Sequence, residues 1–278
     1  MGFIMSLQTD RVSGQLYRTL VKERDKLLDI VSLKYPHETQ FQFGLEDFKS
    51  YQSLYSQGCV NLSKGGSIPH NRTRFCKGCK NHFYTKRPEI ETSVDIEIGL
   101  ALEQVFKNSL NDYFEKYKLN LVCDKADKEH LNMPDFKVFD KETGKVIIYF
   151  EFKCIFKPFL SIAKKVNPNY LCYSHSMTLD CDVKLATQLG LIESNGLHER
   201  AVYVYWYDLP CVKGVFWAPS SLIKETLENT TQYARNIVDG DYDGKTKRGH
   251  TEKIYLPLHS MRDFSSFVAK VIEDHRSG

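Results

Sequence analysis

The sequence of 278 residues contains no window that approaches the roughly 18 consecutive apolar residues of a membrane-spanning helix. Its N-terminal segment has no basic stretch followed by a long apolar run, so no secretory signal is recognised. Eight cysteines in a chain without such a signal indicate reduced thiols and predict a cytoplasmic protein. A strong excess of one charge is also missing, because the formal net charge of +3 is too small to establish a nucleic-acid partner.

Several common catalytic motifs are absent as well. The sequence has no glycine-rich phosphate loop, no GxSxG nucleophile elbow and no HExxH zinc motif. What remains is ordinary globular composition, with 42% hydrophobic and 26% charged residues. A chain of this length can form one large domain or two small ones around a sizeable core.

The most regular patterning lies after residue 91. An apolar stripe from Ile98 to Tyr117 predicts a helix over residues 94–117 that packs against a sheet. Strands are predicted over 120–123, 136–140, 146–153, 202–207 and 253–257, and further helices over 180–193 and 261–274. This order predicts an α/β core over residues 92–278, with a central mixed sheet flanked by helices. Residues 1–91 are predicted to form a helix (11–31) and an irregular N-terminal lobe.

Residues 134–153 (PDFKVFDKETGKVIIYFEFK) form the most informative segment. The glycine in DKETGK, between two apolar runs, predicts a β-hairpin with Asp135 at the start of its first strand. Side chains alternate along a strand, so Phe150 and Phe152 face the core while Glu151 and Lys153 share the other face. We expect pairing within the hairpin to bring Asp135 beside Glu151.

These residue types suit one kind of chemistry. Carboxylate oxygens of Asp135 and Glu151 suit Mg²⁺, and the backbone carbonyl of Phe152 is a natural further ligand. Such a metal polarises a phosphodiester and acidifies a bound water, while Lys153 can orient that water or stabilise the developing charge. The alternative is an amphipathic hairpin whose charged side chains are simply solvated.

The motif also resembles a known family. Pro134-Asp135, fifteen intervening residues and Glu151-Phe152-Lys153 on an apolar strand resemble the PD-(D/E)XK nuclease superfamily, which includes most type II restriction endonucleases. The resemblance implies a restriction-endonuclease-like core, catalytic Asp135, Glu151 and Lys153, and Mg²⁺-dependent hydrolysis of DNA. Family members often add a glutamate from the preceding helix. Glu103 flanks the apolar stripe whereas Glu97 points nearly opposite it, so Glu103 is favoured.

A second motif suggests a structural metal. Cys76 and Cys79 form a CxxC pair, with His70 six residues before it and His82 three residues after it. Thiolate and imidazole ligands at this spacing suit tetrahedral Zn²⁺, and Cys59 is a further candidate ligand. The alternative is two incidental thiols beside exposed histidines.

Basic residues predict contacts with DNA phosphates and bases. They lie in the N-terminal lobe, after the catalytic strand, on the helix over 180–193 and in a glycine-rich loop: Arg72, Arg74, Arg87, Lys157, Lys184, Lys247 and Arg248. Asp180 and Gln188 are expected on the same helical face as Lys184. For the basic cluster of the N-terminal lobe and for the glycine-rich loop, the alternative is an ordinary solvated surface.

Together these patterns predict a Mg²⁺-dependent type II restriction endonuclease acting on double-stranded DNA. Such enzymes commonly form homodimers, whose two-fold symmetry matches a palindromic site. One alternative is a phage or repair nuclease of the same fold that recognises DNA structure. The other is a non-catalytic, zinc-containing nucleic-acid-binding protein in which Asp135, Glu151 and Lys153 are incidental.

Overall fold

A computed structural model of the chain describes residues 91–126, 132–155, 176–180, 183–208, 213–229, 233–236, 242–243, 246–247, 250–257 and 260–277, together with five helical positions between residues 16 and 23. In these ranges no helix is long and apolar enough to cross a membrane. The predicted irregular lobe lies outside the described residues, and the division into domains at residue 91 stays a prediction.

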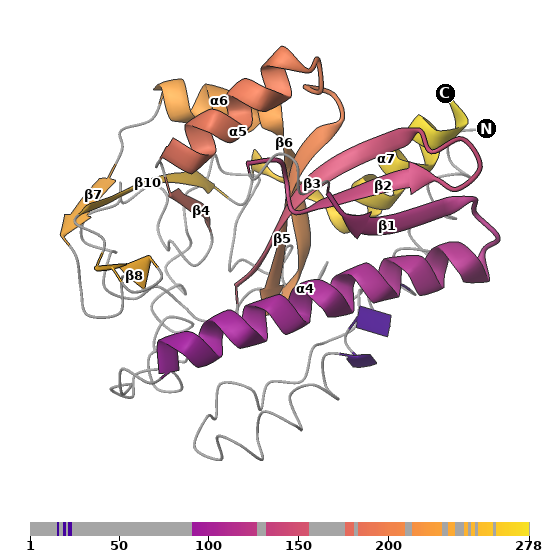
Figure 1. Cartoon of the computed structure of the whole chain (residues 1–278), viewed down its shortest axis with the longest axis horizontal. Coiled ribbons are helices and arrows are strands. Elements are labelled where there is room, and N and C mark those ends of the chain that lie inside the picture. The colour runs from indigo at the N-terminus through magenta and orange to yellow at the C-terminus, as the bar shows by residue number, and fades with distance from the viewer. Residues whose placement is uncertain are drawn as a thin grey trace, which may run out of the picture.

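A six-stranded mixed sheet forms the centre of the fold, in the order β1-β2-β3-β5-β6-β11 (Figure 1). Its strands are β1 (Leu121–Lys125), β2 (Phe136–Asp140), β3 (Val146–Ile155), β5 (Ala201–Asp208), β6 (Lys213–Pro219) and β11 (Arg262–Asp263). Strands β3 and β5 are parallel, and every other neighbouring pair in this sheet is antiparallel. The parallel pair requires a crossover, and the chain between its strands includes a helix.

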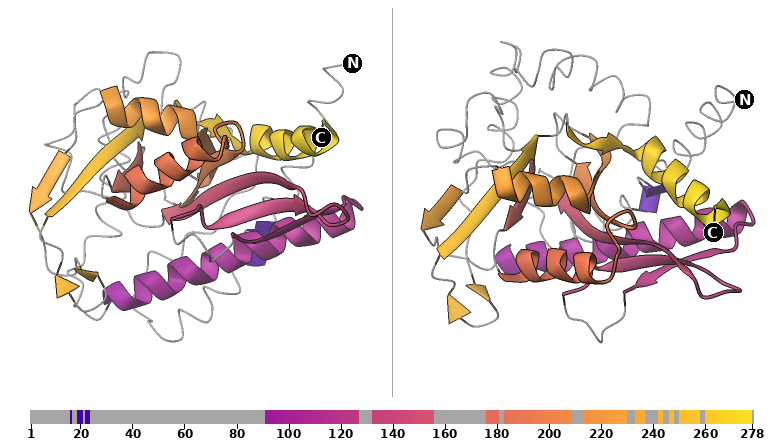
Figure 2. Two further views of the ribbon diagram at one scale, coloured as in Figure 1. Left: turned by 45° about the horizontal axis from the view of Figure 1, so that its top comes forward. Right: turned by 90° about the horizontal axis from the view of Figure 1, so that it is seen from above.

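Helices cover this sheet, which confirms the predicted α/β architecture. They are α4 (Glu91–Lys116), α5 (Val183–Ser194), α6 (Ser220–Asn229) and α7 (Phe264–Arg276). The long α4 runs along one face of the sheet, whereas α5 and α6 lie side by side, with Gln188 of α5 reaching β3 from the opposite face (Figures 1 and 2). A smaller sheet of β4 (Ser176–Asp180), β10 (His250–Pro257) and β7 (Tyr233–Asn236) lies beyond, with a two-stranded ribbon of β8 (Tyr242–Asp243) and β9 (Thr246–Lys247).

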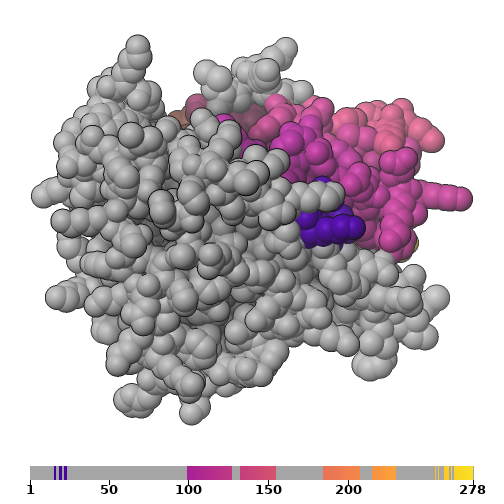
Figure 3. Space-filling view, turned by 90° about the horizontal axis from the view of Figure 1, so that it is seen from below, coloured from indigo at the N-terminus to yellow at the C-terminus, as the bar shows by residue number. Residues whose placement is uncertain are grey.

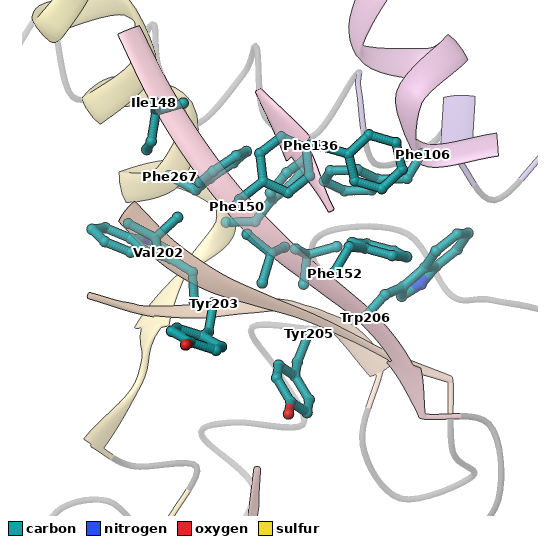
Figure 4. Packing of buried hydrophobic residues seen from close by; sticks show 14 of the residues in the cluster. Phe106, Phe136, Ile148, Phe150, Phe152, Val202, Tyr203, Tyr205, Trp206 and Phe267 are labelled. Carbon is teal, nitrogen blue, oxygen red and sulfur yellow. The ribbon is translucent and has the colours of Figure 1, made fainter. Parts of the chain in front are cut away.

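Aromatic side chains from α4, α7 and the hairpin fill the core on one face of the central sheet (Figure 4). The ring of Phe106 on α4 lies 4.4 Å from that of Phe152 on β3 and 6.4 Å from that of Phe267 on α7. Phe136 stacks on Phe150 across the hairpin at 5.2 Å. The predicted inward aim of Phe150 and Phe152 is therefore confirmed, and it directs their neighbours on β3 to the opposite face.

The described N-terminal positions belong to the same core. Leu16 and Leu20 are buried within it, and Figure 3 shows this segment, in indigo, against the magenta of α4. They are helical, in agreement with the helix predicted over residues 11–31 at the positions that the structure describes.

The tip of the hairpin is held from two sides. Gly144 adopts a φ of 70° in the turn, a conformation that glycine accepts without strain. The Asp140 carboxylate accepts hydrogen bonds from Thr143 and contacts Nε2 of His275 on α7 at 2.8 Å. The Thr143 N–H and then His275 hold the pKa of Asp140 well below its usual range. The hairpin that carries the charged motif is thereby fixed to the C-terminal helix.

The predicted secondary structure differs from the observed one in several details. Helix α5 begins at Val183 rather than at 180, and Asp180 ends strand β4, so it is not on the helical face of Lys184 and Gln188. Strands β4, β6, β7 and β11 and helix α6 were not predicted. Strand β6 was missed because it is a continuous apolar run without alternation. The glycine-rich loop contains the β8–β9 pair, because its short segments form backbone bridges.

Candidate active site

The register of the hairpin positions two acidic residues opposite each other. Phe136 of β2 pairs with Phe150 of β3 in antiparallel register, so Asp135 lies across from Glu151. Residues directly opposite in an antiparallel pair point to the same face of the sheet. That face is the one away from Phe150 and Phe152, and it is covered by α5, whose Lys184 and Gln188 reach Glu151.

Asp135 is fixed against the strand that carries its partner. Its Oδ2 accepts a hydrogen bond from the backbone N–H of Phe152 at 3.0 Å. Burial and the nearby carboxylate of Glu151 raise the pKa of Asp135 to about 6, and the Phe152 N–H and the Lys153 ammonium oppose this rise only in part. The half-buried carboxylate of Asp135 and the buried one of Glu151 repel each other, and such a pair favours a cation.

Glu151 is nearly inaccessible, with 4% of its surface exposed, and it accepts hydrogen bonds from three side chains. Its Oε1 lies 3.3 Å from Nζ of Lys153 and 3.5 Å from Nζ of Lys184, and its Oε2 lies 3.0 Å from Nε2 of Gln188. Burial alone would raise the pKa of Glu151, but the two ammonium groups and Gln188 outweigh it and lower the pKa overall. Glu151 is therefore held as a carboxylate.

A residue that sequence reasoning missed orients this arrangement. Tyr203 on β5 donates a hydrogen bond from its hydroxyl to Oε1 of Gln188, which leaves the Gln188 amide to donate to Glu151. Burial and the charges of Glu151 and Asp135 raise the pKa of Tyr203, so its proton is retained. Tyr203 and Tyr205 point away from the aromatic core (Figure 4). The alternation of VYVYWYD was a signal for this face, although not for the partner of Tyr203.

The helix preceding the hairpin, α4, carries Glu103, which contacts neither Asp135 nor Glu151 in the hydrogen bonds and ion pairs of the described residues but pairs with Lys125. Oε2 of Glu103 forms an ion pair with Nζ of Lys125 on β1 at 2.7 Å. The charge of Glu103 makes the smallest of the named contributions to the raised pKa of Asp135, after burial and Glu151. The side chain of Glu97 lies outside the described residues, so the choice between these two glutamates stays a prediction.

Most of the predicted zinc and DNA contacts fall outside the described residues. These are Cys59, His70, Arg72, Arg74, Cys76, Cys79, His82, Arg87, Lys157 and Arg248. Lys247 ends β9, and the structure does not describe its side chain. Lys184 is the one predicted DNA contact whose side chain is described, and it lies against Glu151. Within the described ranges, no group of three or more His, Cys, Asp and Glu side chains is arranged to hold a metal.

The comparisons with known proteins are sparse. No protein-family model matches this sequence, and no curated protein matches it either. Among solved structures, a nuclease from a fusellovirus is similar to 70% of this chain over 98% of its own length, with a TM-score of 0.38 and 8% sequence identity. A superposition this loose carries no argument about activity, so the function is inferred from the geometry of the site itself.

Proposed function

We propose that the chain is a Mg²⁺-dependent nuclease of the PD-(D/E)XK type that hydrolyses phosphodiester bonds in double-stranded DNA. The observation that carries this proposal is the placement of Asp135 opposite Glu151, with the Lys153 ammonium 3.3 Å from Glu151. Solvated surface charges would not explain it, because Glu151 is buried and has three side-chain hydrogen-bond donors.

The chemistry of the donors fits Mg²⁺. Asp135 and Glu151 offer carboxylate oxygens, and the backbone carbonyl of Phe152 is the third protein oxygen that would hold the ion. A cation there would relieve the repulsion that, together with burial, raises the pKa of Asp135 to about 6. Only two carboxylates contribute, which suits an ion that keeps several water ligands and meets a substrate phosphate.

Each residue then has a role that follows from its position. When bound, Mg²⁺ would supply Lewis-acid polarisation of the phosphodiester and a more acidic water. The Lys153 ammonium, on the same strand face as Glu151, is placed to orient the attacking water and to stabilise the negative charge that develops on the phosphate. Gln188 keeps Glu151 aimed at the site through its hydrogen bond to Oε2, and Tyr203 orients Gln188 by donating to its Oε1. DNA phosphates would approach from the α5 side, where Lys184 lies.

Within this class we favour a type II restriction endonuclease that acts as a homodimer on a palindromic sequence. The support is the size of the chain and the motif spacing, as given by the sequence. A phage or repair nuclease has the same site chemistry and differs only in what directs it to DNA.

Digestion of plasmid DNA tests the activity and separates these alternatives. With Mg²⁺, the wild-type protein should give discrete fragments, whereas Glu151→Gln should lower cleavage by about a hundredfold or more, because a neutral amide cannot hold the cation. Glu193→Gln is the matched control, since Glu193 forms an exposed ion pair with Lys224 outside the site. A smear or selective nicking would instead favour a phage or repair nuclease that recognises DNA structure. DNA binding without cleavage, unchanged in Glu151→Gln, would refute the nuclease proposal.

A further inference from the structure

The buried carboxylate of Glu151 forms ion pairs with two lysines at once. One carboxylate oxygen, Oε1, is shared by two ammonium groups from different elements, Lys153 on β3 and Lys184 on α5. The other oxygen is engaged by Gln188. Any divalent cation that binds Glu151 must therefore compete with positive charge already in place.

The two lysines are not equivalent in this competition. Lys153 lies two residues along the same strand as Glu151, its Nζ is closer at 3.3 Å, and its side chain is 40% exposed. Lys184 reaches across from α5, its Nζ is 3.5 Å away, and its side chain is 52% exposed. The longer and more exposed contact is the weaker one, because water screens it and the flexible lysine stem loses entropy by holding it. Lys184 is thus the ammonium that leaves Glu151 more easily.

We infer that Lys184 is an exchangeable counter-ion of Glu151. It neutralises the buried carboxylate while no divalent cation is bound, and it yields to that cation, after which its ammonium is available to a DNA backbone phosphate. This inference rests on the proposed function and adds a regulation to it. Because the displacement frees a phosphate-binding group, cation binding and DNA binding should strengthen each other, and such coupling is reciprocal.

Mg²⁺ binding in the absence of DNA is the first readout, and it needs no catalysis. Isothermal titration of Lys184→Met with MgCl₂ should show binding about threefold to tenfold tighter than in the wild type, because the competing ammonium is gone while the aliphatic stem remains. Lys184→Arg keeps the charge and should bind Mg²⁺ like the wild type. Lys224→Met, which removes a lysine from an ion pair with Glu193 on the helices, is the matched control and should also leave binding unchanged.

DNA binding is the second readout, with Ca²⁺ as a probe cation that occupies oxygen sites. Addition of Ca²⁺ should strengthen binding of the wild-type protein to a DNA duplex, and this gain should be smaller in Lys184→Met by about the same factor as the change in Mg²⁺ affinity. Circular dichroism of each variant verifies the fold, and Lys184→Gln, which also removes the charge, keeps the test valid if the methionine variant is destabilised.

The outcomes separate the two proposals. Mg²⁺ binding that Glu151→Gln abolishes but that Lys184→Met does not tighten would overturn the counter-ion role and leave the nuclease proposal standing. A wild-type protein without any Glu151-dependent Mg²⁺ binding would overturn the nuclease proposal, and the counter-ion role with it. Tighter Mg²⁺ binding in Lys184→Met together with a reduced Ca²⁺ effect on DNA binding would support both.

Discussion

Replacing Lys153 with methionine should lower the Mg²⁺-dependent rate of DNA cleavage by about 10²–10⁴-fold, the range expected for loss of a positioned acid–base or charge-stabilising group. Lys153 shares the face of β3 with Glu151, and its Nζ lies 3.3 Å from Oε1. Single-turnover cleavage of a labelled duplex at saturating enzyme measures the rate of the chemical step separately from binding.

The same variant should bind DNA nearly as well as the wild type in Ca²⁺, because Lys184 and the other basic residues remain to meet the phosphates. Loss of both binding and cleavage would indicate a general contribution of charge instead. Lys224→Met removes an equal charge from an ion pair outside the site, on α6, and should leave DNA binding and cleavage unchanged. A Lys153→Met protein that cuts at the wild-type rate would contradict the role given to this ammonium.

The second large effect is one of stability. Asp135→Asn should raise the free energy of unfolding at pH 8 by about 1–3 kcal/mol in the absence of divalent ions, while it abolishes cleavage. Burial and Glu151 raise the pKa of Asp135 to about 6 in the folded protein, whereas the unfolded chain has a value of about 3.9. The folded state therefore binds the proton more tightly and is penalised once Asp135 ionises. Asparagine carries no charge, and its carbonyl can still accept the Phe152 N–H.

The sign of the pH dependence follows from that shift. The stability of the wild-type protein should fall, relative to that of Asp135→Asn, as the pH rises from about 4 through 6, and the two should converge toward pH 4. Urea denaturation in EDTA at a series of pH values measures the difference. In the control Asp124→Asn the effect should be absent or reversed: burial raises the pKa of Asp124, but hydrogen bonds from Lys125 and Lys107 lower it overall. A less stable Asp135→Asn protein at pH 8 would contradict the strained carboxylate pair.

Part of the fold was predictable from local patterns. The apolar stripe of α4 and the alternation in residues 146–153 identify the helix and the hairpin. In both cases apolar residues recur at the period of a single helix or strand. The turn alone does not give the register at the site. Phe139 pairs with Val146 beside the turn, but a β-bulge then shifts the pairing by one residue, so that Phe136 pairs with Phe150. Strand β6 was missed because both faces of its central residues are buried, so Phe216 and Trp217 give no alternation.

The residues of the candidate site were likewise predictable only in part. Asp135, Glu151 and Lys153 are close in sequence once the hairpin is recognised, and alternation along β3 predicts the common face of Glu151 and Lys153. The β-bulge that sets Asp135 opposite Glu151 was not predicted. The hydrogen bonds of Gln188 and Tyr203 join α5 and β5 to β3 across long sequence separations. Such contacts depend on how the elements pack, and no periodicity encodes them. Lys184 was expected to contact DNA, and the structure adds its contact with Glu151.

A cation held between two carboxylates is the centre of the proposed site, and crystals soaked in MnCl₂ test it most directly. An anomalous difference map should show a peak between Asp135 and Glu151, beside the carbonyl of Phe152, because Mn²⁺ accepts the same oxygen ligands as Mg²⁺. The peak should be missing in Glu151→Gln. A wild-type map without density at this position, in crystals that take up Mn²⁺ elsewhere, would contradict the proposed site.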